Sequence, residues 1–213
     1  MHKYVIATIA LLMTFSAGFA QRKALTPAEV AALKAKVAAN TKSLQSLESD
    51  FTQSKQLSYM DDAINASGKL YFKAPRKIRW EYLQPTGYAV VFDNQTMHVD
   101  EGGGKQRHLD MASNKRLKGL SDLLVGTVQG GDLFDDSRFA ITYYREGIGY
   151  VATLIPKEKA LQRYIKQVEL TLNGNNFLLT RVKITDPTQD YTLIDFENQR
   201  KNAAIPEDKF MIK

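Results

Sequence analysis

The residues best suited to hold a metal ion are two histidines, His98 and His108, on neighbouring predicted strands. An aspartate follows each histidine by two positions, at Asp100 and Asp110, so each strand offers an imidazole and a carboxylate. A zinc site takes three or four protein ligands, and these histidines come without a convincing third. We therefore expect exposed polar strand residues here, with no metal and no cofactor.

Motifs for phosphate binding and for nucleophilic catalysis are weak in this chain. Residues 101–105, EGGGK, are rich in glycine, but a phosphate loop needs a longer spacing before its Gly-Lys pair and a helix after it. A strand pattern follows instead, which indicates a hairpin turn. Ser121 and Ser137 have neither a G-x-S-x-G setting nor a nearby histidine, and the chain has no cysteine. We expect no catalytic residue and interpret the protein as a non-enzyme.

The remaining possibility is binding by burial of apolar surface. Residues 68–82, GKLYFKAPRKIRWEY, are rich in apolar and aromatic residues and include the only tryptophan. Alternate residues of a strand point to opposite faces of a sheet. Leu70 and Phe72 therefore share one face of the first strand. On the next strand, Ile78, Trp80 and Tyr82 do the same. The opposite face is predicted to meet solvent and is rich in cations: Lys69, Lys73, Lys77 and Arg79.

A helix and many short strands must position these residues. Thr26, Pro27 and Glu29 resemble a capping box, and apolar residues recur at helical spacing after them, which predicts an amphipathic helix over 27–44. Turn residues separate the later strands, and leucines at three- and four-residue spacings predict a short helix over 114–126. The predicted strands begin near Leu47 and continue over 66–73, 77–83, 88–93, 95–100, 105–111, 139–145, 150–156, 164–172, 177–186 and 190–197.

A curved sheet of about eleven strands has a concave face that two helices cannot fill, so it either packs solid or leaves a lined cavity. We expect the cavity, although Trp80 as ordinary core is the simpler alternative. The cavity is predicted to be lined by Phe51, Leu70, Phe72, Ile78, Trp80, Tyr82 and Val91, with Leu57, Leu154, Val168, Leu170 and Leu193 as further inward candidates. The two helices are predicted to form a lid through Leu33, Val37, Leu120, Leu123 and Leu124, and ordinary helix-to-sheet packing is the alternative.

Residues 1–20 have the pattern of a secretory signal peptide: a lysine near the start, an apolar run, and small residues before a cut after Ala20. The apolar run is short for a membrane anchor. We expect an exported protein, with residues 21–213 forming one domain that has no lipid anchor, because there is no cysteine. The net charge of +6 is modest and spread along the chain, which does not favour a nucleic-acid partner.

The chain resembles the LolA-type outer-membrane lipoprotein carriers. The resemblance rests on the order of four segments behind the first helix: LESDFTQSK (47–55), GKLYFKAPRKIRWEYLQP (68–85), VVFDNQTMHVD (90–100) and YTLIDFENQRKNAAIPEDKF (191–210). It implies an α+β fold, an incomplete and strongly curved antiparallel β-barrel with a helical lid over an apolar cavity. It also implies an inner-membrane release complex and an outer-membrane acceptor as partners.

Residue by residue, the resemblance places Trp80 at the family's cavity tryptophan and Ile78 at an aromatic position linked to transfer. Ala74 departs from the family, whose members commonly hold an arginine before this proline that helps to control the lid. The expected function is a monomeric periplasmic carrier of acylated lipoproteins. A carrier or sensor of another lipid, or a periplasmic domain that binds protein partners, stays an alternative.

Overall fold

The computed structural model describes residues 22–93, 96–101, 106–110 and 134–211. The predicted signal peptide (1–20) and the predicted helix over 114–126 lie outside these residues. The described part of the chain forms one antiparallel sheet of twelve strands and a long helix, α1 (Pro27–Lys42). The expected antiparallel sheet of about eleven strands is confirmed, with the twelfth a two-residue strand.

The strands follow one another along the chain with few interruptions. Their bounds are β1 (Lys23–Ala24), β2 (Ser46–Gln56), β3 (Ile64–Lys73), β4 (Lys77–Gln84), β5 (Tyr88–Asp93), β6 (Thr96–Asp100), β7 (Gln106–Asp110), β8 (Phe139–Glu146), β9 (Gly149–Pro156), β10 (Gln167–Leu172), β11 (Leu179–Thr185) and β12 (Tyr191–Lys201). Two short helices complete the described structure: α3 (Lys159–Gln162) and the 3-10 helix η1 (Glu207–Phe210).

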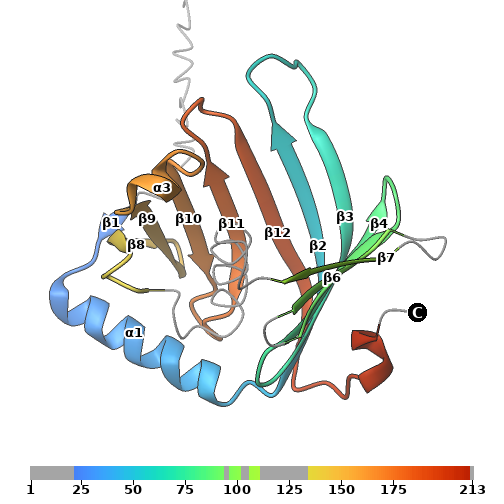
Figure 1. The fold of residues 1–213 in the computed structure, drawn as a ribbon. Helices are drawn as coiled ribbons and strands as arrows, with labels where there is room; N and C mark the ends of the chain where they lie inside the picture. The colour runs from blue at the N-terminus through green and yellow to red at the C-terminus, as the bar shows by residue number, and fades with distance from the viewer. Residues whose placement is uncertain (1–21, 94–95, 102–105, 111–133, 212–213) are drawn as a thin grey trace, which may run out of the picture.

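The sheet is open, with the order β1-β8-β9-β10-β11-β12-β2-β3-β4-β5-β6-β7. Strand β12 lies beside β2, so the second half of the chain returns to the start of the first half. The sheet curves strongly, and α1 runs across one end of it (Figure 1). We call this the lower end, and the opposite end, where residues 57–63 connect β2 to β3, the upper end.

Local chemistry explains where α1 begins. The Thr26 hydroxyl accepts a hydrogen bond from the backbone N–H of Glu29, and the Glu29 carboxylate accepts one from the Thr26 N–H at 2.8 Å. This capping box satisfies two N–H groups that the helix itself leaves free, and Pro27 occupies the first turn, where its missing N–H costs nothing. The predicted N-terminal helix is thus confirmed, two residues shorter at its C-terminal end.

Two apolar clusters lie on opposite sides of the sheet. The large one fills the concave face and includes the lower-end residues Leu33, Val37 and Leu44. The small one lies on the outer face and consists of Tyr71, Val91, Ile205 and Phe210. The second cluster forms because the chain continues beyond β12 and η1 packs over β4.

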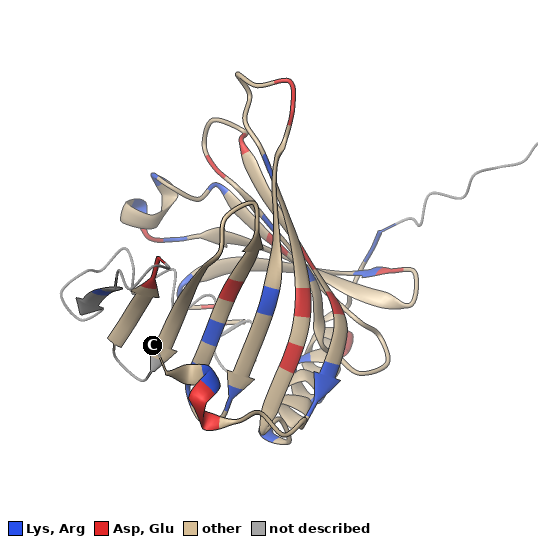
Figure 2. Cartoon of the chain, turned by 90° about the vertical axis from the view of Figure 1, so that its right-hand side faces the viewer, with Lys and Arg blue, Asp and Glu red and all other residues tan. Residues whose placement is uncertain are grey.

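The prediction that the outer face of β3 and β4 is a plain solvent face is therefore wrong. The Tyr71 side chain is buried there, and the Arg79 side chain is 14% exposed. The cations are paired within the chain: Lys69 with Asp50 at 2.7 Å, Lys73 and Lys77 with Glu207 at 2.6 and 2.8 Å, and Arg79 with Glu81 at 2.9 Å. Figure 2 shows acidic and basic positions side by side on these strands.

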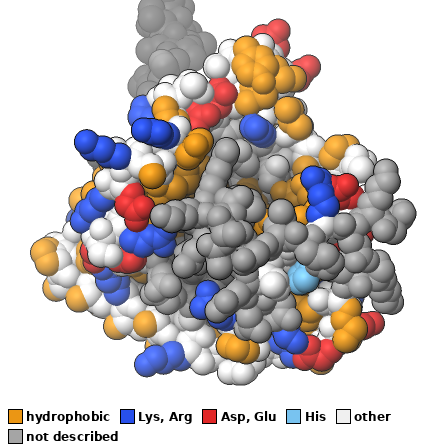
Figure 3. Space-filling view, viewed as in Figure 1, with side chains coloured by type: hydrophobic (Ala, Val, Ile, Leu, Met, Phe, Trp, Pro, Cys, Tyr) orange, Lys and Arg blue, Asp and Glu red, His pale blue; other side chains and the backbone are white. Residues whose placement is uncertain are grey.

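Several large apolar side chains stay exposed at the upper end. They lie on the β2–β3 connection, at the start of β3 and around the β4–β5 turn: Tyr59, Met60, Ile64, Leu83 and Tyr88. Hydrophobic side chains gather over the β2–β3 connection at the top of the space-filling view (Figure 3). No helix of the described residues is long and apolar enough to cross a membrane.

Candidate functional site

The concave face of β2, β3 and β4 is built from directly opposed apolar pairs. Leu70 opposes Trp80, and Phe72 opposes Ile78, as the alternation of the sequence predicts. All four side chains are at most 5% exposed. The predicted inward face of residues 68–82 is therefore the face that the large concave cluster occupies.

Aromatic rings form a continuous row along this face. The ring centroid of Tyr88 lies 4.4 Å from that of Tyr82 in a stacked pair, and Tyr82 meets Phe51 edge to face at 5.1 Å. Phe51 lies 4.7 Å from Trp80, which meets Phe196 of β12 at 5.9 Å. We call Tyr88, Tyr82, Phe51 and Trp80 the aromatic row. It leads from a ring that is 38% exposed to one that is 5% exposed.

A few polar atoms interrupt this apolar face. The Tyr82 hydroxyl donates a hydrogen bond to Gln53 Oε1 at 2.9 Å, and burial raises the pKa of that hydroxyl. Burial also raises the pKa of Tyr143 on β8. The Tyr143 hydroxyl and Trp80 Nε1 are buried and have no partner in hydrogen-bond geometry within the described structure. Among the described residues, this mainly apolar face therefore carries one hydrogen-bonded polar pair and two buried polar atoms without a partner.

Val91 does not belong to this wall, which corrects the predicted set of cavity residues. It opposes Arg79, whereas its neighbour Val90 opposes Trp80, so Val91 points to the outer face. There it packs in the small cluster with Tyr71 and Ile205. The prediction for Leu193 is also wrong, because it opposes Lys183 on the outer face, while the buried Ile194 points inward.

The predicted lid is described only in its first half. Leu33 and Val37 are 2% and 3% exposed and belong to the concave cluster, so α1 packs on the wall of the candidate site. Leu120, Leu123 and Leu124 lie outside the described residues. Ala74, for which the resemblance implied an arginine, contributes a backbone hydrogen bond from its N–H to the Gln45 carbonyl at 2.8 Å.

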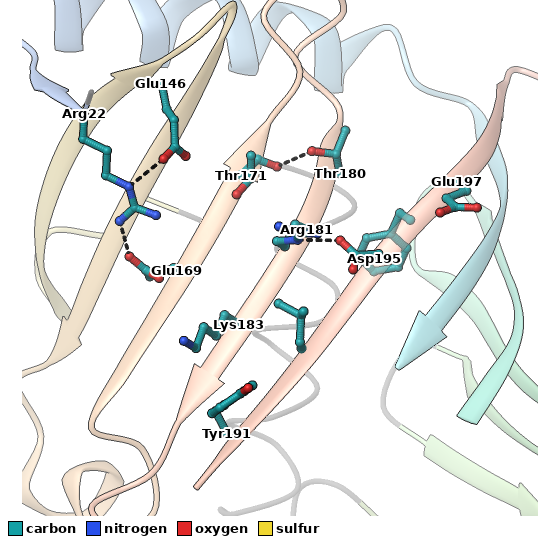
Figure 4. Close-up of a pocket in the computed structure, with 12 residues that line it drawn as sticks. Arg22, Glu146, Glu169, Thr171, Thr180, Arg181, Lys183, Tyr191, Asp195 and Glu197 are labelled. Carbon is teal, nitrogen blue, oxygen red and sulfur yellow. Dashed lines mark hydrogen bonds and ion pairs between the residues drawn. The ribbon is translucent and has the colours of Figure 1, made fainter. Parts of the chain in front are cut away.

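A polar groove lies on the outer face of β10, β11 and β12, with a volume of about 670 Å³ (Figure 4). Arg22 bridges Glu146 and Glu169 at 3.0 and 2.6 Å, and Arg181 pairs with Asp195. The Lys183 ammonium lies 4.4 Å from the centroid of the Tyr191 ring. The groove therefore has charges of both signs, and Arg22, Glu146, Glu169, Arg181 and Asp195 are paired with one another within the chain.

The two histidines that the sequence singled out lie on neighbouring strands. His98 and His108 occupy directly opposed positions of β6 and β7. Among the described residues, no group of three or more histidine, cysteine or acidic side chains could hold a metal ion.

Sequence reasoning missed three residues of the concave face: Tyr88, Tyr143 and Phe196. Each lies on a strand whose bounds the sequence predicts closely, and Phe196 directly opposes Phe51. Pairing of β12 with β2 joins segments about 145 residues apart in the chain, and no local pattern encodes such a partner. For Tyr88, the signal was its place directly after the Pro85-Thr86-Gly87 turn, which puts it opposite Tyr82.

The sequence matches a known protein family and a curated relative. Residues 42–213 match the family described as outer membrane lipoprotein carrier protein LolA. An outer-membrane lipoprotein carrier protein of Chromobacterium violaceum is 25% identical over 185 residues, which cover 85% of this chain and 81% of that protein.

Solved structures support the fold. A chain of the Pseudomonas aeruginosa MucA/MucB complex has a TM-score of 0.52 at 12% identity, covering 87% of this chain and 61% of that one. An uncharacterized conserved protein of Thermus thermophilus has a TM-score of 0.52 at 11% identity, covering 85% and 92% of the two chains. At these identities the likeness concerns the fold alone.

Proposed function

The chain belongs to the LolA family of outer membrane lipoprotein carrier proteins, and from this premise we propose that it carries acylated lipoproteins by binding their acyl chains on its concave face. The observation that supports this most is the aromatic row, which joins an exposed ring to a buried apolar wall. Binding of this kind is burial of hydrocarbon and needs no catalytic residue.

The energetics of acyl chains favour such a wall. Each buried CH₂ group contributes about 0.8 kcal/mol, so a lipid anchor with several acyl chains has almost no free form in water. A carrier must offer a comparable apolar surface. In this proposal the large cluster supplies it when α1 opens, through side chains such as Phe51, Phe72 and Leu170, which are at most 2% exposed in the described structure.

Release of the cargo requires that binding is not too tight, and α1 supplies a means to limit it. If α1 closes over the empty concave face, opening it costs free energy, and this cost is subtracted from the binding free energy. Leu33 and Val37 hold the closed position in this proposal. Leu120, Leu123 and Leu124 are proposed as the second part of the lid.

The proposal includes a location and partners. The protein would be exported by a signal peptide over residues 1–20 and act in the periplasm. It would receive lipoproteins from an inner-membrane release complex and pass them to an outer-membrane acceptor. The match to the outer membrane lipoprotein carrier family supports a role in lipoprotein transport, and the expected monomer suits a shuttle.

A second candidate function is the binding of a protein partner. The related fold in the Pseudomonas aeruginosa MucA/MucB complex belongs to an assembly of two proteins. In this chain, the outer groove between Arg22 and Glu197 is the feature that favours a polypeptide over a lipid, because charged and hydroxyl side chains line it.

Mass spectrometry of organic extracts from the natively purified protein separates these functions. We expect acylated peptide to copurify with it, and to be depleted in the Phe51→Glu variant, which places a charge on the wall. A matched control is Thr52→Glu, since Thr52 is an exposed neighbour on the same strand. Recovery of a different lipid would replace the proposed cargo. If wild-type protein yields no lipid at all, the carrier proposal fails.

A further inference from the structure

The exposed apolar side chains of the upper end lie next to the outer ring of the aromatic row. Tyr88 follows the β4–β5 turn, whose other side carries Leu83 at 49% exposure. The β2–β3 connection adds Tyr59 at 77% and Met60 at 39%. Exposed rings and aliphatic chains are costly in water unless they meet an apolar partner, and a group of them marks a contact surface.

Helix α1 closes the other end. Its contacts are with residues of the lower end: the Lys36 ammonium lies 5.7 Å from the Phe177 ring in the β10–β11 connection, and Asn40 accepts a hydrogen bond from Lys201 at the end of β12. Figure 1 shows α1 across this end and away from the β2–β3 connection. The described helix therefore leaves the upper end of the concave face uncovered.

The aromatic row joins the upper end to the interior. Two steps lead from the rim to the indole: 4.4 Å from Tyr88 to Tyr82 and 6.5 Å from Tyr82 to Trp80. Exposure falls along the row, from 38% for Tyr88 to 5% for Trp80. An acyl chain that lies along these rings contacts an aromatic ring at each step, and the hydroxyl of Tyr82 is held by its hydrogen bond to Gln53.

We propose that acyl chains enter the concave face from the upper end, with Tyr88 as the outer step and Trp80 as the inner one. This inference rests on the proposed function and specifies the ligand class, a long acyl chain, and its direction. The polar head stays in water beside Tyr88, because burying a charged or strongly polar group is costly.

Trp80 is the only tryptophan, so its fluorescence reports on this route without labelling. Stearic acid brominated beside its carboxyl group, at mid-chain or near its methyl end is titrated into the delipidated protein, and quenching is measured. Trp80 lies two ring spacings inside the rim, so mid-chain bromine should quench most strongly. Equal quenching at all positions, or strongest quenching beside the carboxyl group or near the methyl end, would overturn the proposed direction.

Association kinetics test the outer step. Stopped-flow mixing with the mid-chain probe should show association about tenfold slower in Tyr88→Ser, within the one to three decades over which association rates vary among variants of one interface. Tyr164→Ser is the control, since Tyr164 is 49% exposed and lies beyond α3, away from the row. Equal rates in both variants would overturn the role of Tyr88.

The failure of this route is distinguishable from failure of the proposed function. If mass spectrometry finds bound lipid but no brominated stearate quenches Trp80, acyl chains bind elsewhere and only the route is wrong. If neither lipid nor quenching is found, the carrier function itself is wrong and the route falls with it.

Discussion

The rings of Phe51 and Tyr82 meet edge to face across a third strand, with centroids 5.1 Å apart. Phe51 is on β2 and Tyr82 on β4, and Gly68 of β3 opposes both of them. A side chain at position 68 would stand between the two rings. The aromatic row therefore depends on a residue that has no side chain at all.

Replacing this glycine should break the contact. In Gly68→Ala, the new Cβ would lie 1.9 Å from the Glu81 carbonyl oxygen and 2.9 Å from Phe51 Cε1, so the backbone and the ring must both move. We expect a loss of about 1–3 kcal/mol in the free energy of unfolding, typical of overpacked cores. Urea denaturation followed by Trp80 fluorescence measures it.

Gly87→Ala is the matched control. Its Cβ would find no atom closer than the Tyr82 carbonyl oxygen at 4.0 Å, so the same methyl group is added without a clash. Its unfolding free energy should stay within about 1 kcal/mol of wild type. Equal losses in the two variants would show that Gly68 does not separate the rings as described.

Removing the hydroxyl should change the free energy of unfolding in opposite directions at Tyr143 of β8 and Tyr150 of β9. The Tyr143 hydroxyl is buried without a partner in the described structure, so Tyr143→Phe should keep or gain stability, by up to about 1 kcal/mol. The Tyr150 hydroxyl accepts a hydrogen bond from Arg145 at 3.0 Å, so Tyr150→Phe should lose about 0.5–1.5 kcal/mol. Urea denaturation of both variants decides this; a clear loss in Tyr143→Phe would mean that its hydroxyl has a partner.

The sequence predicts the strands and the inward face of β3 and β4 because their alternation is strict. In residues 77–82, a charged residue precedes each apolar one, and period two then assigns the faces. Strand β5 reads YAVVFD, apolar at four successive positions after Tyr88, so no alternation tells Val90 from Val91. Such a run indicates a strand buried on both faces, and the structure shows this burial.

The residues that cover the outer face of β5 are far from it in the sequence. Ile205 and Phe210 reach Val91 from the end of the chain, more than a hundred residues away. The prediction of a solvent face failed at Lys73 and Lys77 for the same reason: their carboxylate partner, Glu207, belongs to this distant segment. Local patterns describe a strand and its two faces, but not which later segment packs on them.

The ion pairs of Glu207 should make the stability of the folded protein depend on pH. The ammonium groups of Lys73 and Lys77 lower its pKa from an ordinary 4.5 to about 2. A carboxylate with a lowered pKa stabilises the folded state above its unfolded pKa and loses that contribution as the pH falls through its folded value. Glu207→Gln should therefore be less stable than wild type at neutral pH, and the difference should shrink below about pH 4.5 and vanish below about pH 2.

Urea midpoints of both proteins across this range measure the difference, at low salt because the pair is exposed and salt screens it. Asp208→Asn is the control, since the Asp208 carboxylate forms no ion pair with a described residue. A pH-independent difference between Glu207→Gln and wild type would contradict the ion pairs as its source.

If α1 is a lid, a substitution that loosens its packing should lower the stability of the protein and raise its affinity for an acyl chain. Leu33→Ala removes a fully buried side chain and should lower the free energy of unfolding by about 2–5 kcal/mol. If α1 must open before cargo binds, weaker packing of α1 also raises the fraction of open molecules. Affinity for an acyl probe should then rise, about tenfold for each 1.4 kcal/mol of lid packing lost, until most molecules are open.

Leu47→Ala separates a lid from ordinary packing, because Leu47 is equally buried but belongs to β2 and opposes Phe72 on the sheet itself. It should lose a similar amount of stability without any gain in affinity. Fluorescence titration of both variants with the same acyl probe gives the answer. If Leu33→Ala binds no more tightly than wild type, α1 packs as core and opening it does not oppose binding.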